Sequence, residues 1–168
     1  MEPKWLSPDE REAWLGLAAV LELLPGVLDA QLRRDADLTQ FEYYVLAMLS
    51  EASERTMRMT ELAAITNATL PRLSHVVRRL ADRGLVDKRP CPTDGRATNA
   101  TLTEAGWKKV RDAAPGHVAH VREHVIDALS ANQISQLTEL THAVLERLDP
   151  DGTMRPAQRR EEGSGREP

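Results

Sequence analysis

With 168 residues, the chain has the length of a single domain and can bury a substantial core. Its 41% hydrophobic and 29% charged residues are ordinary for a globular protein, and no apolar run approaches the roughly 20 residues of a membrane span, so we expect no membrane contact. A single cysteine excludes an intrachain disulfide framework, and no signal-peptide pattern opens the sequence; both favour a cytoplasmic location.

The net charge of −4 hides an uneven distribution. Residues 55–111 contain twelve basic and five acidic side chains, a local charge of +7, whereas the rest of the chain carries −11. Because a phosphate backbone responds to the local field, the middle of the chain is the candidate for binding nucleic acid.

The first predicted element is one long helix over about 8–35. The segment Ser7–Glu10 has the pattern of a capping box with a proline in the first turn. Apolar residues then recur every three or four positions from Trp14 to Leu32. Pro25-Gly26 interrupts this pattern, so we expect a kink there, and two separate helices are the alternative.

A second capping box, Thr39–Glu42, predicts a helix over about 40–52. Its buried face is expected to contain Phe41, Tyr44, Val45, Met48 and Leu49. An extended segment at 57–59 follows, after which Thr60 is expected to cap a short helix over 61–66.

The next helix, predicted over about 69–83, has two contrasting faces. Its apolar face is expected to be buried and contains Leu70, Leu73, Val77 and Leu80. Gly84 ends the helix, and strands are predicted over 85–89 and 98–102, joined by a loop rich in turn-forming residues. A helix followed by such a hairpin is typical of a winged helix-turn-helix, which lays one helix and one loop on duplex DNA.

The C-terminal part is predicted to be helical. Thr103 is expected to cap a helix over about 104–129, and a third capping box, Ser130–Gln133, starts a helix that runs to about Leu148. From Asp149 onward apolar residues are almost absent, so we expect a disordered tail.

The polar face of the 69–83 helix is expected to contact double-stranded DNA in the major groove. We assign base contacts to Arg72 and His75, a base or phosphate contact to Ser74, and phosphate contacts to Arg78 and Arg79. A solvated basic face is the alternative.

The hairpin is expected to reach the minor groove. Asp94-Gly95 would shape a tight tip that projects Arg96 outward, and arginine suits the negative potential of a narrow minor groove. Asp94 itself would bond turn amides or pair with Arg96 or Arg89, which would hold the loop in shape.

These residues carry a resemblance to a known family. The pattern of Asp94, Arg96, Leu102 and Thr103 resembles the wing signature of MarR-type transcriptional regulators. Further matches to that family's core lie at Leu62-Ala63, Leu73-Ser74, Leu80, Arg83–Val86 and Thr103–Gly106, and the resemblance covers about Leu6 to Leu148.

The resemblance implies a mainly α fold with a small β wing, a winged helix-turn-helix flanked by N- and C-terminal dimerisation helices. It divides the chain into an arm (1–38), a DNA-binding lobe (39–103), C-terminal dimerisation helices (104–148) and the tail (149–168). It also implies a homodimer on a pseudo-palindromic operator, usually repressing, with Arg96 in the minor groove. His75 stands where many members carry arginine and is a weaker partner for phosphate.

The resemblance further implies a small-molecule effector, because members often bind a phenolic or other anionic ligand between the arms and the lobe. The candidates for such a pocket are Trp14, Tyr43, Tyr44, Trp107 and His117. Core or interface packing is the alternative for each of them.

Three histidines, His117, His120 and His124, fall along one helical face and could share a zinc ion. A site would need further ligands, so we expect neither a metal nor a cofactor, and a zinc-responsive regulator is an alternative. Cys91 lies between two prolines beside basic residues, and a surface thiol is the default for it.

Two other classes of function compete with a DNA-binding regulator. A winged-helix protein-interaction module would use the same fold with an incidental basic face. An enzyme has no support, because the sequence contains no nucleophile–histidine constellation, phosphate-binding glycine loop or metal-hydrolase spacing.

Overall fold

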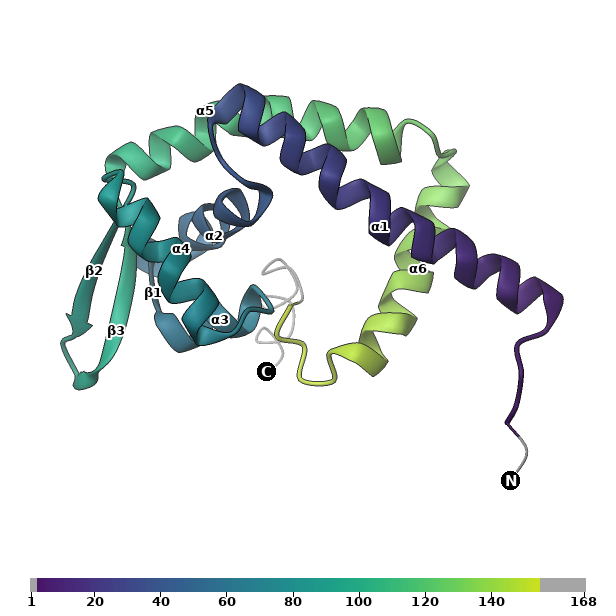
Figure 1. Ribbon diagram of the computed structural model, residues 1–168, viewed down its shortest axis with the longest axis horizontal. Helices are drawn as coiled ribbons and strands as arrows, with labels where there is room; N and C mark the ends of the chain where they lie inside the picture. The colour runs from purple at the N-terminus through teal and green to yellow at the C-terminus, as the bar shows by residue number, and fades with distance from the viewer. Residues whose placement is uncertain (1–2, 155–168) are drawn as a thin grey trace, which may run out of the picture.

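A lobe of three helices and a small sheet carries long helices that extend away from it (Figure 1). The computed structural model describes residues 3–154. Its elements are α1 (Pro8–Ala36), α2 (Gln40–Glu51), the 3₁₀ turn η1 (Ser53–Arg55), β1 (Thr56–Arg58), α3 (Met59–Ile65), α4 (Leu70–Asp82), β2 (Val86–Cys91), β3 (Asp94–Leu102), α5 (Glu104–Val121), the π-helical segment η2 (Arg122–Ile126) and α6 (Ala131–Leu148). The predicted fold class, a winged helix-turn-helix between flanking helices, is confirmed.

The helix starts follow the local capping signals. Both bonds of the capping box are present at Ser7, Thr39 and Ser130, which satisfies backbone N–H groups that the first turn leaves unpaired. α1 runs without a break through Pro25, which confirms one long helix rather than two. It ends at Asp37, whose φ of 49° is left-handed.

Only the last part of α1 is buried, at Leu28, Gln31, Leu32 and Ala36. The preceding turns expose large apolar side chains, among them Trp14, Leu15, Leu17, Val20, Leu21 and Leu23. An 18-residue window of α1 has a mean hydropathy of 1.6, so the helix is long and apolar enough to cross a membrane by length and composition alone, which corrects our expectation that no segment would be. One such helix is weak evidence for a membrane, since a helix that packs against protein has the same composition.

The core lies where α2, α3 and α4 pack on the sheet. Leu46 and Leu49 of α2, which the sequence pattern only partly assigned to the core, are fully buried. They join side chains from the loop before α2 and from α3, α4, β2 and β3: Leu38, Leu62, Leu73, Val77, Leu80, Val86, Ala100 and Leu102. Val110 and Ala113 of α5 close this core, so the base of α5 belongs to the lobe.

The sheet is antiparallel with β3 in the middle, in the order β1-β3-β2. The β2–β3 hairpin is longer than predicted, because pairing continues from Val86↔Leu102 to Cys91↔Asp94. The two residues that connect the strands are therefore Pro92 and Thr93, and Asp94-Gly95 lies at the start of β3 rather than at the tip.

Two details of the helix-turn-helix were predicted wrongly. Thr60 does not cap α3, which begins at Met59 after Arg58. Met59 is buried in the core, so the chain turns into the helix before Thr60 is reached. Leu70, expected inside, is 44% exposed because it lies in the first turn of α4, beyond the edge of the core.

The C-terminal helices follow the prediction more closely. α5 starts after Thr103 and passes through Pro115, but it ends at Val121, and the next five residues wind as the π-helical η2. α6 covers Ala131–Leu148 as expected. Residues 149–154 form turns, and the remainder of the predicted tail, 155–168, lies outside the described residues.

Candidate nucleic-acid interface

α4 presents a basic face because its apolar face is committed to the core. The Thr69 hydroxyl caps the helix by accepting from the Arg72 N–H at 3.4 Å. Leu73, Val77 and Leu80 are completely buried, which turns the residues between them outward. The exposed residues are Arg72, His75, Arg78 and Arg79, with Ser74 half-buried at the edge.

A groove separates α4 from the hairpin. Residues of the helix-turn-helix line one side and residues of β2 and β3 line the other: Met59, Thr60, Leu70, Ser74, Lys88, Arg96, Ala97 and Thr98. Ser74 of α4 and Arg96 of the hairpin thus face the same concavity, although 22 residues of chain separate them. Lys88 adds a second cation to it.

The basic side chains of α4 have partners within the lobe. The Arg72 guanidinium lies 4.3 Å from the centre of the Phe41 ring, an arrangement that orients it without neutralising it. Arg78 donates to Nδ1 of His75 at 2.9 Å. That bond leaves Nε2 of His75 to face outward as a donor. Pairing of this kind limits the rotamers of both side chains.

In the hairpin, Asp94 Oδ1 accepts from the backbone N–H of Arg96 at 3.1 Å. The Arg96 side chain is exposed. Arg89, the other arginine considered for Asp94, pairs instead with Asp87 at 3.2 Å. Asp94 therefore bonds the backbone amide of Arg96 and not its guanidinium, and its role in shaping the wing stays a prediction.

The base of the hairpin is joined to α5. Gly84, with φ of 71°, ends α4 and turns the chain into β2. Its carbonyl accepts from the Thr103 hydroxyl at 2.8 Å, and the Thr103 oxygen accepts in turn from the Gly106 N–H at 3.0 Å. The hairpin and α4 consequently share one fixed support.

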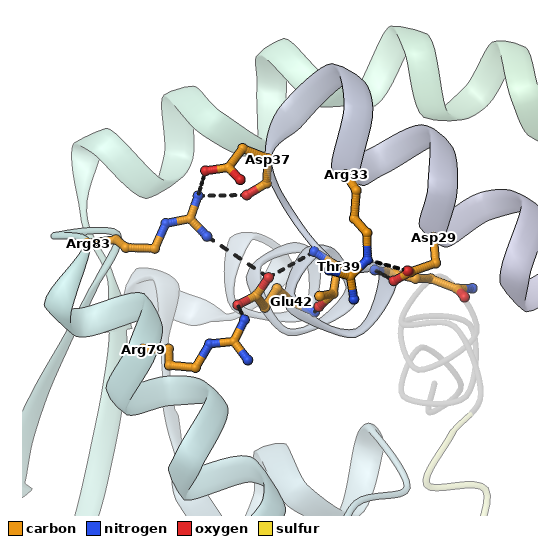
Figure 2. Close-up of polar contacts among 8 residues, drawn as sticks. Asp29, Arg33, Asp37, Thr39, Glu42, Arg79 and Arg83 are labelled. Carbon is orange, nitrogen blue, oxygen red and sulfur yellow. Dashed lines mark hydrogen bonds and ion pairs between the residues drawn. The ribbon is translucent and has the colours of Figure 1, made fainter.

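A charged cluster that the sequence did not reveal joins α4 to α2 and the end of α1 (Figure 2). Glu42 is 2% exposed, and its Oε1 accepts from Arg79 at 2.5 Å. Its Oε2 accepts from the Thr39 N–H at 2.8 Å and lies 4.0 Å from the Arg83 guanidinium. Arg83 also donates to the Asp37 carbonyl and carboxylate at 2.7 and 3.1 Å.

Comparison with known proteins agrees with this geometry. The family model described as "MarR family" matches residues 36–97. The MarR family regulator Sco3205 from Streptomyces coelicolor, solved in complex with DNA, is 41% identical; the match covers 88% of this chain and 93% of that one, with a TM-score of 0.84. AbsC from the same organism is 36% identical, covers 87% and 98%, and has a TM-score of 0.82.

The chain belongs to the MarR family. It is a DNA-binding transcriptional regulator and not an enzyme. A curated relative, the HTH-type transcriptional repressor IacR from Pseudomonas putida, is 26% identical over 119 residues, 71% of this chain and 70% of that protein.

The structure of this MarR family chain brings two of the five effector-pocket candidates together. Tyr43 of α2 and His117 of α5 have ring centroids 4.6 Å apart. Nearby, Nδ1 of His117 and Oε1 of Gln31 are buried and have no hydrogen-bond partner among residues 3–154. Burial, and secondly His120, lowers the pKa of His117, and burial raises that of Tyr43.

The other three candidates lie apart. Trp14 is 54% exposed on the outer part of α1. Tyr44 donates to the Ile65 carbonyl at 3.1 Å, which is a packing role inside the lobe. Trp107 is covered by the Arg55 guanidinium at 4.5 Å from its ring centre.

The three histidines that the sequence placed on one helical face of this MarR family chain do not form one cluster. His120 and His124 approach Glu123, and their ligand atoms all lie within 4.8 Å of one another. His117 is outside that group. Cys91 is largely buried, and a hydrogen bond with Thr93 at 3.3 Å lowers the pKa of its thiol. A surface thiol was expected, but the extended β2 turns this side chain inward.

Proposed function

We propose that this regulator binds a pseudo-palindromic operator as a homodimer, with α4 in the major groove and the wing in the minor groove of each half-site. The main observation in support is the groove that is lined by both Ser74 and Arg96. It lies on a basic surface and separates a helix from a hairpin, as contact with two adjacent DNA grooves requires. The related Sco3205 was solved in complex with DNA, which supports the same binding mode here.

Within this proposal the contacts are divided by type. Arg72, Ser74 and His75 lie toward the N-terminal half of α4 and would reach bases, and Arg78 would meet a phosphate. Arg96 would enter the minor groove while Asp94 and Gly95 shape the start of β3. A phosphate contact by Arg79 remains a competing prediction, because Glu42 already holds its guanidinium.

Dimerisation is proposed from exposed apolar surface on the flanking helices. Trp14, Leu17 and Leu21 of α1 and Leu140 and Val144 of α6 are all more than one-third exposed. Surfaces of this kind on a protein of this size mark an interface. A second copy of the chain suits them, since a two-fold axis would also place two α4 helices on successive half-sites. The segments 1–38 and 104–148 would then form the dimerisation region.

The function is tested by selecting bound sequences from a random duplex pool. We expect enrichment of a motif with two-fold symmetry, which would establish DNA reading and the dimer together. A protein that enriches no motif would instead favour the protein-interaction module. Repression is then checked by placing the selected operator in a promoter reporter and measuring expression with and without the protein.

Control by a small effector is proposed for the junction of α1, α2 and α5. Tyr43 and His117 form an aromatic wall there, and Gln31 and His117 each offer a buried polar atom that a ligand could satisfy. The test is to add aromatic carboxylates to the protein–operator complex and to measure release of the DNA. Equal release from wild type and His117→Phe would argue against this junction. We also propose that this regulator is soluble and cytoplasmic.

Zinc control is a second candidate, and the cluster of His120, Glu123 and His124 favours it. Equilibrium dialysis against zinc, followed by an operator-binding assay, tests this alternative. A protein that retains no zinc, or that binds DNA equally with and without it, excludes it.

A further inference from the structure

We infer that Glu42 is a positioning residue for DNA reading: it holds the recognition helix α4 at the angle required by the operator, through Arg79 and Arg83. This inference rests on the proposed use of α4 in the major groove. It reassigns Arg79 from a phosphate contact to an orienting one. Figure 2 shows Arg79 of α4 and Arg83, the residue that follows α4, turned toward the start of α2 and the end of α1.

The burial of Glu42 requires compensation. A carboxylate that is 2% exposed has lost nearly all its hydration, which is tolerated only when hydrogen bonds and opposite charges replace the water. Three groups do so: the Thr39 N–H at 2.8 Å, the Arg79 guanidinium at 2.5 Å and the Arg83 guanidinium at 4.0 Å. The N-terminus of α2, where backbone N–H groups converge, adds a favourable dipole.

Glu42 performs two tasks that can be separated chemically. In the capping box it accepts from Thr39, a task that glutamine performs equally well in the same motif. The chain itself demonstrates this, because Gln133 completes the capping box of α6. Only a carboxylate, however, carries the negative charge that attracts the Arg79 and Arg83 guanidinium groups. The cap therefore does not need the charge of Glu42, and it is this charge that connects Glu42 to the two arginines.

The two arginines fix the orientation of α4 because they act one helical turn apart. Arg79 binds Glu42, while Arg83, just past the end of α4, binds both the Asp37 carbonyl and its carboxylate. Two anchors on one face of a helix prevent rotation about its axis as well as tilting. Such rotation would move Arg72 and Ser74, which lie on the remaining surface of the same helix, relative to the base edges.

The anchors also connect α4 to the long arm. Asp37 is the left-handed residue that ends α1, and Asp29 of α1 accepts from the Gln40 N–H at 2.8 Å while pairing with Arg33. Movement of the α1 arm relative to α2 would therefore act directly on the group that holds Arg79 and Arg83. The cluster is a mechanical link between the arm and the DNA-reading surface.

The test is Glu42→Gln, which keeps the cap bond and removes the charge. Its matched control is Glu10→Gln in the exposed capping box of α1, where Glu10 accepts from the Ser7 N–H at 2.7 Å. We measure affinity for the selected operator and for a scrambled duplex, because non-specific binding depends on phosphate charge and little on helix angle. Glu42→Gln should lose about tenfold or more of the operator-to-scrambled ratio, while Glu10→Gln keeps it.

A double-mutant cycle with Arg79→Gln distinguishes orientation from phosphate contact. If Arg79 acts through Glu42, the two losses are not additive, and the double variant binds the operator no worse than the weaker single variant. The salt dependence of binding would then be unchanged in Arg79→Gln. A direct phosphate contact would instead lower the slope by about one, and the two losses would add.

These outcomes decide the inference. A wild-type ratio in Glu42→Gln, or additive losses with a reduced salt slope, would overturn it. Failure of the wild-type protein to select any duplex would overturn the proposed function first, and the two failures are thus distinguishable. If a thermal unfolding curve shows that Glu42→Gln is not folded, the more exposed Arg83→Gln is used to test the second anchor. The same two duplexes and the same operator-to-scrambled ratio are then measured.

Discussion

The hydroxyl of Thr103 donates to the carbonyl oxygen of Gly84 at 2.8 Å. Gly84 ends the recognition helix, and Thr103 begins α5, so this bond closes the base of the wing across the whole β2–β3 hairpin. Because Thr103 also caps α5 through the Gly106 N–H, one side chain aligns the recognition helix, the wing and the helix that leads toward α6.

Gly106→Ala should destabilise the lobe strongly. A Cβ at this position would lie 2.1 Å from the Leu85 carbonyl oxygen and 2.6 Å from Leu102 Cδ1, so α5 would have to move away from the wing base. We expect a loss of about 1–3 kcal/mol or more in the free energy of unfolding, measured by denaturant titration. Gly26→Ala is the control, since nothing lies within 4 Å of a Cβ there. Equal stability of the two variants would contradict the packing described.

Arg96→Ala should weaken operator binding and reduce its salt dependence by about one unit of slope, because the side chain is expected to displace counterions from the minor groove. Arg89→Ala is the matched control: it lies on the same hairpin, is exposed and pairs with Asp87. Fluorescence anisotropy at several salt concentrations measures both. An Arg96 variant that behaves like the Arg89 variant would remove the wing from the mechanism.

Comparing His75→Ala with Arg96→Ala shows how much of the operator affinity comes from α4 and how much from the wing. His75 already accepts from Arg78 and provides only an Nε2–H donor outward, so we expect its removal to cost less affinity than that of Arg96. The same anisotropy assay applies. A larger loss for His75→Ala would reverse this order and assign the greater share to α4.

Leu140→Glu should convert the proposed dimer to a monomer and abolish tight operator binding. Leu140 of α6 is 66% exposed, and a carboxylate buried in an apolar interface would be left unpaired. Sedimentation velocity measures the mass, and anisotropy the DNA affinity. Glu139→Gln, one position away, is a control that leaves apolar surface unchanged. A dimeric Leu140→Glu would show that α6 lies outside the interface.

Stability should fall as the pH decreases below about 6.5. Burial holds the pKa of His117 below this ordinary value, so in that range the unfolded chain binds the proton and the folded chain does not. The loss of stability begins near pH 6.5 and levels off below the pKa of His117 in the folded protein. Thermal unfolding between pH 5 and 8 for wild type and His117→Gln measures it; the variant should show a shallower decline. Parallel pH profiles would exclude His117 as the source.

What could be predicted from sequence was decided by local interactions. The capping boxes at Ser7, Thr39 and Ser130 are bonds between residues three apart, and each marked the start of a helix correctly. The basic face of α4 and the glycine at its end followed from spacing alone. These features depend on neighbours within one helical turn, which a sequence displays directly.

What could not be predicted depends on pairs far apart in the chain. Glu42 was visible as a capping residue, but its bond to Arg79 spans 37 positions. The hairpin extends to Cys91 because β3 offers it a partner, and Phe41 lies beneath Arg72 because α2 packs beside α4. Thr60 does not cap α3, because the buried Met59 already begins the helix. In each case the deciding contact comes from tertiary packing, which the local sequence does not display.

None of the side chains of α6 is fully buried within residues 3–154, although its eighteen residues are helical throughout. An isolated helix of this length is marginal in water, so we propose that its order comes in part from a second copy of the chain. If a second copy supplies it, folding and association are one equilibrium, and the melting temperature rises with protein concentration. The cellular amount of this regulator would then set not only operator occupancy but also the fraction of chains that escape proteolysis.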